Sequence, residues 1–126
     1  MLVHVFLGLV AIQFFLAGLG AFHHNPKPSE KIVETSAFDP QRIGGDIISL
    51  VTILIVITAV VTRRQVQLSL ALLVLMIVQN VLAGLGEKAA VFGALHALNG
   101  VAITAVAVIM MLGMRPGSAR PAPTAR

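Results

Sequence analysis

The sequence predicts an all-α transmembrane four-helix bundle built from two parallel two-helix repeats. Apolar residues make up 57% of the chain and charged residues only 11%, whereas a soluble domain carries about 25% charged residues. Most of the apolar residues lie in long runs, each close to the roughly 20 residues that a helix needs to cross a bilayer. The phrase LAGLG also occurs twice, within QFFLAGLG at 13–20 and within QNVLAGLG at 79–86.

The apolar runs predict membrane-spanning helices over residues 2–22, 43–62, 68–86 and 91–114. Inside a bilayer only helices and closed barrels pair their own backbone groups. Continuous apolar runs favour helices, because barrel strands alternate between apolar and polar residues. We therefore expect one transmembrane domain over residues 1–114, followed by a tail over 115–126 that is rich in Pro, Ala and Arg and predicted to be disordered.

The first apolar run could be a signal peptide, and the segment after it is long for a connection between two helices. No Lys or Arg precedes Lys27, so the basic region that opens a signal peptide is missing. We expect the first helix to be retained. The first loop, residues 23–42, contains Pro26, Pro28 and Pro40, which exclude a regular helix across most of it.

The basic residues predict the orientation in the membrane. Arg63 and Arg64 lie between the second and third runs with no acidic residue beside them, and the tail carries Arg115, Arg120 and Arg126. Short basic loops tend to stay in the cytoplasm. We expect a multi-pass protein of the bacterial inner membrane with both termini cytoplasmic. The net charge of +4 reflects this topology and does not indicate nucleic-acid binding.

The doubled phrase defines the internal repeat. A shift of 66 residues places Gln13 on Gln79, and a weaker pairing, shifted by 55, places Gln41-x-x-x-Gly45 on His96-x-x-x-Gly100. Clusters of Ala and Gly let helices approach closely in lipid, and amides there hydrogen-bond across helices. The phrase is therefore interpreted as a packing motif, with Gln13 and Gln79 as interhelical polar contacts.

His96 is the leading candidate for a ligand site. Asn99 and Gly100 follow at i+3 and i+4 and therefore share its helix face. One interpretation is a neutral His that is hydrogen-bonded to Asn or Gln. The other is an axial ligand of haem b, with the Gly leaving room for the macrocycle. The second haem ligand would be His23 or His24 at the end of helix one.

The charged residues of helix two are the other polar candidates. Arg42 lies at i−4 to Asp46, so a local ion pair is expected. The functional alternative is a proton or cation site. The spans hold no second carboxylate for a proton relay, and the chain has no phosphate loop, nucleophile elbow or metalloprotease motif. We therefore predict no catalytic residues and no metal site.

Several stretches resemble a family of uncharacterised four-helix membrane proteins common in actinobacteria, a domain of unknown function. They are QFFLAGLGAF, FDPQRIGG and LHALNG, over about residues 1–112. In that family helix two carries His-x-x-x-Gly, and helix four carries His with Asn at i+3. Gly45, His96 and Asn99 match, whereas Gln41 replaces the His. The chain more distantly resembles one four-helix half of haem A synthase, in which histidines on the helices hold haem. This resemblance implies that the chain binds haem or a quinone.

Three functions stay open on this basis. The first is a structural or accessory membrane subunit, within a larger membrane complex or a homo-oligomer. The second is a haem- or quinone-binding electron-transfer protein centred on His96. The third is a small-molecule or ion carrier, which the parallel repeat suggests.

Overall fold

The computed structural model describes residues 1–23, 39–86 and 89–113. These residues form four helices with no strand among them: α1 (Leu2–His23), α2 (Asp39–Thr62), α3 (Val66–Gly86) and α4 (Ala90–Gly113). Each helix is long and apolar enough to cross a membrane. The predicted all-α fold of four helices is confirmed, and their length and apolar character are consistent with a multi-pass membrane protein.

The helix ends differ from the prediction mainly at the start of α2. This helix begins at Asp39, earlier than the predicted residue 43, with Pro40 in its first turn. The first-turn N–H groups have no partner inside a helix, so the missing N–H of proline costs nothing there. Treating Pro40 as a helix breaker was wrong. The other starts and ends lie within two residues of the prediction, and the tail at 115–126 lies outside the described residues.

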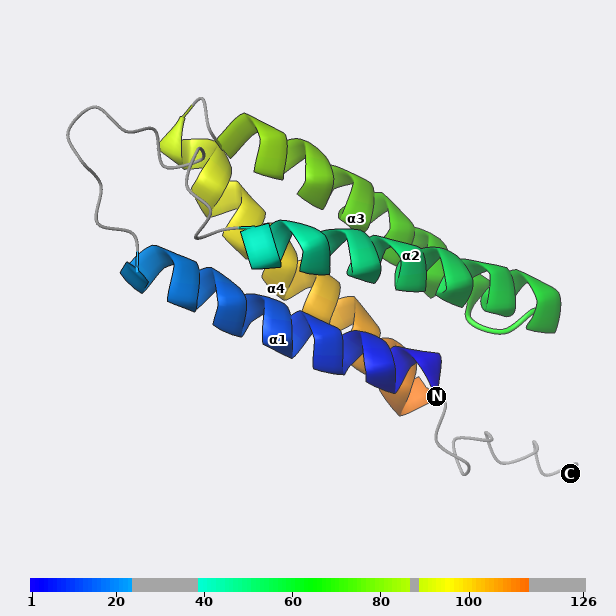
Figure 1. Ribbon diagram of the computed structural model, residues 1–126. Helices are drawn as coiled ribbons and strands as arrows, with labels where there is room; N and C mark the ends of the chain where they lie inside the picture. Colours follow the sequence, from blue (N-terminus) through cyan, green and yellow to red (C-terminus); the bar gives the residue numbers. More distant parts are fainter. Residues whose placement is uncertain (24–38, 87–88, 114–126) are drawn as a thin grey trace, which may run out of the picture.

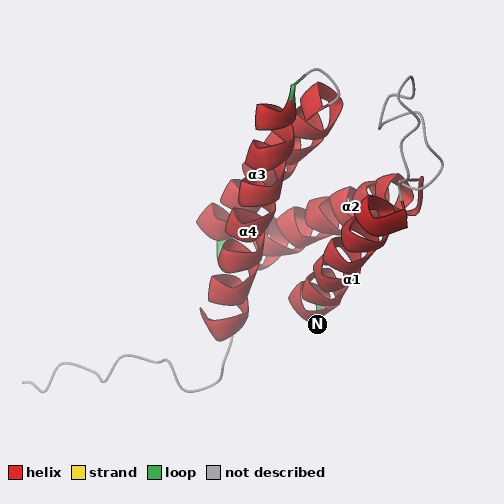
Figure 2. Ribbon diagram, turned by 90° about the vertical axis from the view of Figure 1, so that its left-hand side faces the viewer, coloured by secondary structure: helices red, strands yellow, loops and turns green. Residues whose placement is uncertain are grey.

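The helices form a ring in chain order. α1 packs against α2 and α4, and α3 packs against the same two helices; the α3–α4 contact is the broadest and the α1–α4 contact the narrowest. The N-terminus lies beside the end of α4, and the α2–α3 turn lies at the same end of the bundle (Figure 1). We call this end the turn end and the opposite one the loop end. Figure 2 shows α3 and α4 on one side and α1 and α2 on the other.

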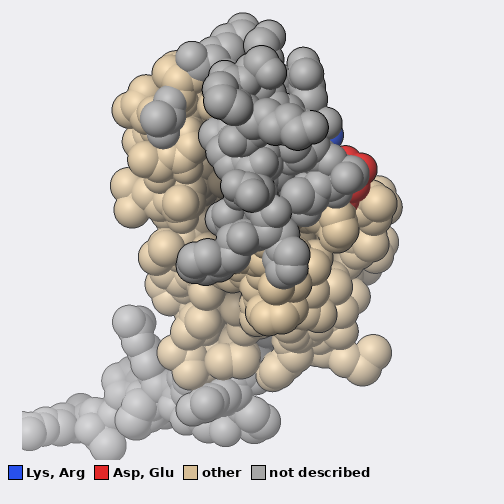
Figure 3. All heavy atoms as spheres, turned by 60° about the vertical axis from the view of Figure 1, so that its left-hand side comes forward, with Lys and Arg blue, Asp and Glu red and all other residues tan. Residues whose placement is uncertain are grey.

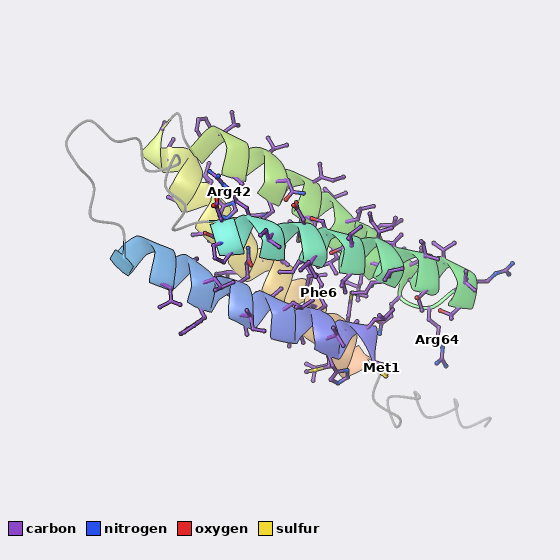
Figure 4. The ribbon with its side chains drawn as sticks, viewed as in Figure 1. Met1, Phe6, Arg42 and Arg64 are labelled. Carbon is purple, nitrogen blue, oxygen red and sulfur yellow. The ribbon has the colours of Figure 1, made fainter. Side chains whose placement is uncertain are left out.

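Close packing is concentrated toward the turn end. Phe6 points from α1 into the space between the helices (Figure 4), and both Phe6 and Leu72 of α3 are 0% exposed. The other buried apolar residues are Val3, Val10, Ile48, Ile55, Ala59, Met76, Ile103, Ala107 and Met110. The buried hydroxyls of Thr52 and Ser69 donate to carbonyls of their own helices. They therefore need no hydrogen-bond acceptor on a neighbouring helix.

The outer surface of the bundle is apolar. Large side chains such as Val61, at 76% exposed, and Leu98, at 66%, point away from the neighbouring helices. On the face in Figure 3 the described atoms are almost all uncharged, apart from a small group of red and blue atoms at one edge. A water-soluble protein rarely exposes apolar area on this scale, so lipid is the solvent that suits this surface.

The α2–α3 turn is a defined structure and not a loose link. Arg63 N–H donates to Val60 O at 3.2 Å and Arg64 N–H to Ala59 O at 3.0 Å, which is the Schellman pattern of a helix end. Arg63 has φ 54°, a left-handed conformation that costs a side-chain-bearing residue about 1–2 kcal/mol. Arg64 points away from the bundle beyond this turn (Figure 4).

Gln65 ties this turn to the end of α4. It also has a left-handed backbone, φ 54°, and its carbonyl accepts a hydrogen bond from Ser69 N–H at 3.0 Å. Its side-chain Nε2 donates to Met110 O at 3.1 Å. Carbonyls in the last turn of a helix lack a partner within the helix. Gln65, directly before α3, therefore donates a hydrogen bond to a carbonyl in the last turn of α4.

Candidate functional site

Three polar residues of α3 and α4, namely Gln79, His96 and Asn99, form a hydrogen-bonded network in the loop-end half. The side chain of Asn99 donates through Nδ2 to Gln79 Oε1 at 2.7 Å and to Leu75 O at 2.9 Å. Gln79 Nε2 lies 3.1 Å from His96 Nε2, and His96 Nδ1 lies 3.2 Å from the backbone oxygen of Gln79. The network joins the two helices through both side chains and backbone.

The partners fix the protonation of His96. An amide nitrogen only donates, so His96 Nε2 accepts from Gln79. The backbone oxygen of Gln79 only accepts, so His96 Nδ1 carries the proton and donates to it. These contacts suit the Nδ1–H tautomer of the ring. Both ring nitrogens of His96 are used within the α3–α4 pair.

Gly100 serves close helix packing at this site. It is buried, and a Cβ built on it would lie 3.3 Å from Phe14 Cζ and 3.6 Å from Gln79 Nε2. Phe14 of α1 thus covers the glycine, where the haem hypothesis expects space for a macrocycle. Haem at His96 requires the Gln79 bond to break and Phe14 to move, so these residues do not fit haem in the described arrangement.

The other histidines are not gathered around His96 in the described part of the chain. His23 is the last residue of α1, but its side chain and all of His24 lie outside what the structure describes. His4 is exposed near the turn end, on the order of 20 Å from His96 along the helix axes. Among the described residues no three His, Asp or Glu side chains come together to hold a metal.

The α1–α2 pair has a simpler polar contact. Gln13 Nε2 donates to the backbone oxygen of Gln41, and its carboxamide lies against Gly44, where an added Cβ would lie 3.3 Å from Gln13 Cδ. At Gly45 a Cβ would lie 3.7 Å from Gln13 Nε2. The acceptor for the Gln13 amide is therefore the backbone oxygen of Gln41 and not a histidine ring. Gly44 leaves the space that the amide occupies.

The charged residues of α2 lie near its start. Arg42 NH1 lies 3.6 Å from Asp39 Oδ1, and both side chains are more than half exposed. The pairing of Arg42 with Asp46 therefore stays a prediction. Asp46 is exposed on the outer face of α2.

A polar contact that the sequence did not single out lies between α2 and α3. Asn80 Nδ2 donates to Ser49 Oγ at 3.3 Å, and Ser49 Oγ donates to Gly45 O at 2.9 Å. Gly44 and Phe14 were also not recognised as parts of the polar contacts. The Gly-Gly pair three residues after Gln41 was the available signal for Gly44, whereas nothing in the sequence pointed to Phe14.

Comparison with protein-family models, with curated proteins and with solved structures found no match to this chain.

Proposed function

We propose that this chain is a structural or accessory subunit of a larger membrane assembly, placed in a bacterial inner membrane with both termini in the cytoplasm. The observation that carries the proposal is the closed network of Gln79, His96 and Asn99. The three side chains bond to one another and to the backbone oxygens of Leu75 and Gln79. Polar groups of this kind lock helices together in lipid. They leave the ring nitrogens of His96 with no free position for a ligand.

The proposal takes the α1–α2 and α3–α4 pairs as two parallel copies of one unit, and burial supports this. The buried residues of α1 recur in α3 at the shift of 66, and three of the four buried residues of α2 recur in α4 at the shift of 55. The matched buried positions are Val3, Phe6 and Val10 with Ser69, Leu72 and Met76, and Ile48, Thr52 and Ile55 with Ile103, Ala107 and Met110.

Equivalent contacts support the repeat independently of burial. Gln13 Nε2 lies 3.7 Å from the Cβ position of Gly45, and Gln79 Nε2 lies 3.6 Å from that of Gly100. One turn further on, Ser49 donates to Gly45 O and Thr104 to Gly100 O, both at 2.9 Å. A packed scaffold that is used twice needs no ligand to explain these residues.

The test of the subunit role is the size of the assembly that contains the chain. The tagged chain is expressed at its natural level, extracted in mild detergent and separated by native electrophoresis. We expect it to migrate within an assembly much larger than a detergent-bound monomer. Migration as the isolated chain, with no larger assembly after crosslinking in the membrane, would contradict the role.

Spectroscopy distinguishes this proposal from a haem protein. The purified chain from haem-supplemented cells is expected to show no Soret absorbance. The ¹⁵N spectrum of His96 should show a protonated Nδ1 and an unprotonated Nε2. A Soret band that His96→Ala abolishes and His4→Ala preserves would replace the subunit role with the redox one.

A further inference from the structure

The outer surfaces of α2 and α3 carry polar groups among apolar ones. Asp46 of α2 and Asn80 of α3 are both exposed, and Asn80 reaches across to Ser49 of α2 at 3.3 Å. The exposed side chains that continue the Asp46 stripe along α2 are apolar, namely Leu50 at 63%, Ile53 at 47% and Ile57 at 53%. A carboxyl group and an amide thus interrupt a surface that otherwise suits lipid.

The depth of these groups places them inside the hydrocarbon layer. At the helix rise, Asp46 lies about 25 Å and Asn80 about 23 Å from the α2–α3 turn. Arg63 and Arg64 at that turn are exposed and belong at the level of the headgroups. With a hydrocarbon layer about 30 Å thick, Asp46 and Asn80 lie about 5 Å or more below the opposite surface.

The proposed repeat shows that the fold does not require these polar groups. The counterpart of Asn80 is Phe14, whose ring lies against Gly100 on the opposite face. The counterpart of Asp46 is Val101, which is 58% exposed. The α1–α4 face is built with apolar residues at both positions, so the polar pair on the α2–α3 face is an addition to the scaffold.

We propose that the α2–α3 face around Asp46 and Asn80 is the docking surface for a transmembrane helix of another protein, and that this helix presents a Lys or Arg at the same depth. A carboxyl group in lipid demands an opposite charge or a hydrogen-bond donor, and Asn80 and Ser49 can bond to polar groups beside that cation. The inference rests on the proposed subunit role and names the face that performs it.

The test uses the full chain in phosphatidylcholine vesicles with synthetic transmembrane helices. One peptide is an apolar Leu/Ala helix that carries a single Lys at the depth of Asp46, and its matched control has Leu in that place. Energy transfer between labelled chain and labelled peptide measures association. We expect the Lys peptide to bind more tightly than the Leu peptide by about 3-fold to 20-fold, the range of one interhelical polar contact in lipid.

The variants are taken from the repeat, so that folding is preserved. Asp46→Val with Asn80→Phe copies the α1–α4 face onto the α2–α3 face and should abolish the preference for Lys. Circular dichroism and gel filtration check that this double variant is folded. The reverse variant, Val101→Asp with Phe14→Asn, should create a second Lys-binding face.

Two results would overturn the docking surface. If the Asp46→Val/Asn80→Phe variant still prefers the Lys peptide, the preference does not come from Asp46 and Asn80. If a preference emerges only after Lys27 and Lys31 are replaced by Ala, the occupant is the first loop of the chain itself.

The same double variant separates this inference from the proposed function. An assembly in native membranes that survives the double variant unchanged would overturn the docking face and leave the subunit role intact. An absent assembly in the wild type would overturn the subunit role itself, whatever the peptides do.

Discussion

The α1–α2 and α3–α4 pairs each contain a glutamine between the two helices, and the two glutamines form different hydrogen bonds. In both pairs a Gln reaches from the first helix to a glycine of the second, Gln13 to Gly45 and Gln79 to Gly100, at nearly the same distance. In α1–α2 the amide then bonds to the backbone oxygen of Gln41. In α3–α4 it bonds to the side chains of His96 and Asn99 instead.

The difference shows how one packing geometry accommodates two chemistries. Where the second helix has Gly44, the carboxamide lies directly against the helix backbone. Where it has Asn99 at the corresponding position, a side chain intervenes and adds a bond to Leu75 O. The α3–α4 pair also has the broader contact. We therefore expect the hydrogen bonds of the α3–α4 pair to contribute more to stability than those of the α1–α2 pair.

The largest expected effect tests this ranking directly. Gln79→Leu removes two side-chain bonds, which leaves His96 Nε2 without its partner and Asn99 Nδ2 with Leu75 O alone. The free energy of unfolding should therefore fall by about 2–3 kcal/mol. Gln13→Leu removes one bond and should cost about 1 kcal/mol. Equilibrium unfolding in mixed detergent micelles measures both, with the exposed Gln67→Leu as a control near zero. Equal costs for Gln79 and Gln13 would refute the ranking.

A smaller effect tests the role of Gly44. A Cβ at this position overlaps the carboxamide of Gln13, so Gly44→Ala should break the bond to Gln41. Ala favours a helix over Gly by up to about 1 kcal/mol, which offsets part of the loss, and the net cost should be about 0.5–1 kcal/mol. The neighbouring Gly45→Ala has ordinary contact distance and should be neutral or stabilising. In a Gln13→Ala background the cost of Gly44→Ala should vanish; its persistence there would exclude the clash as the cause.

The smallest expected effect lies at the turn that joins the two pairs. Arg63→Gly relieves the left-handed strain at φ 54°, and the added freedom of the unfolded chain cancels part of this gain. We expect a net stabilisation of about 0.5 kcal/mol. Arg64→Gly is the matched control and should destabilise slightly, because its backbone is not left-handed. The same unfolding assay measures both variants. Destabilisation by Arg63→Gly would show that the Arg63 side chain stabilises the protein by more than the left-handed backbone costs.

The sequence predicted the scaffold better than the site. Length and apolar content located the four helices to within a few residues, because a span is dictated by the thickness of the bilayer. Pro40 was misjudged, since its effect depends on whether it stands in a first turn or inside a helix. Gln79 was expected to cross between helices, but its partner could not be chosen from the sequence, as Asn99, His96 and Gln13 were all available.

By itself the sequence determined four helices that are long and apolar enough to span a membrane, because backbone and side-chain solvation act residue by residue along each run. Only the tertiary structure decided which polar groups meet. The direction of each side chain across a helix interface decided its contacts. Gln79 bonds to His96 and Asn99, Gln13 bonds to the backbone of Gln41, and Phe14 packs on Gly100. Those directions depend on how the helices rotate against one another, and packing between helices sets that rotation.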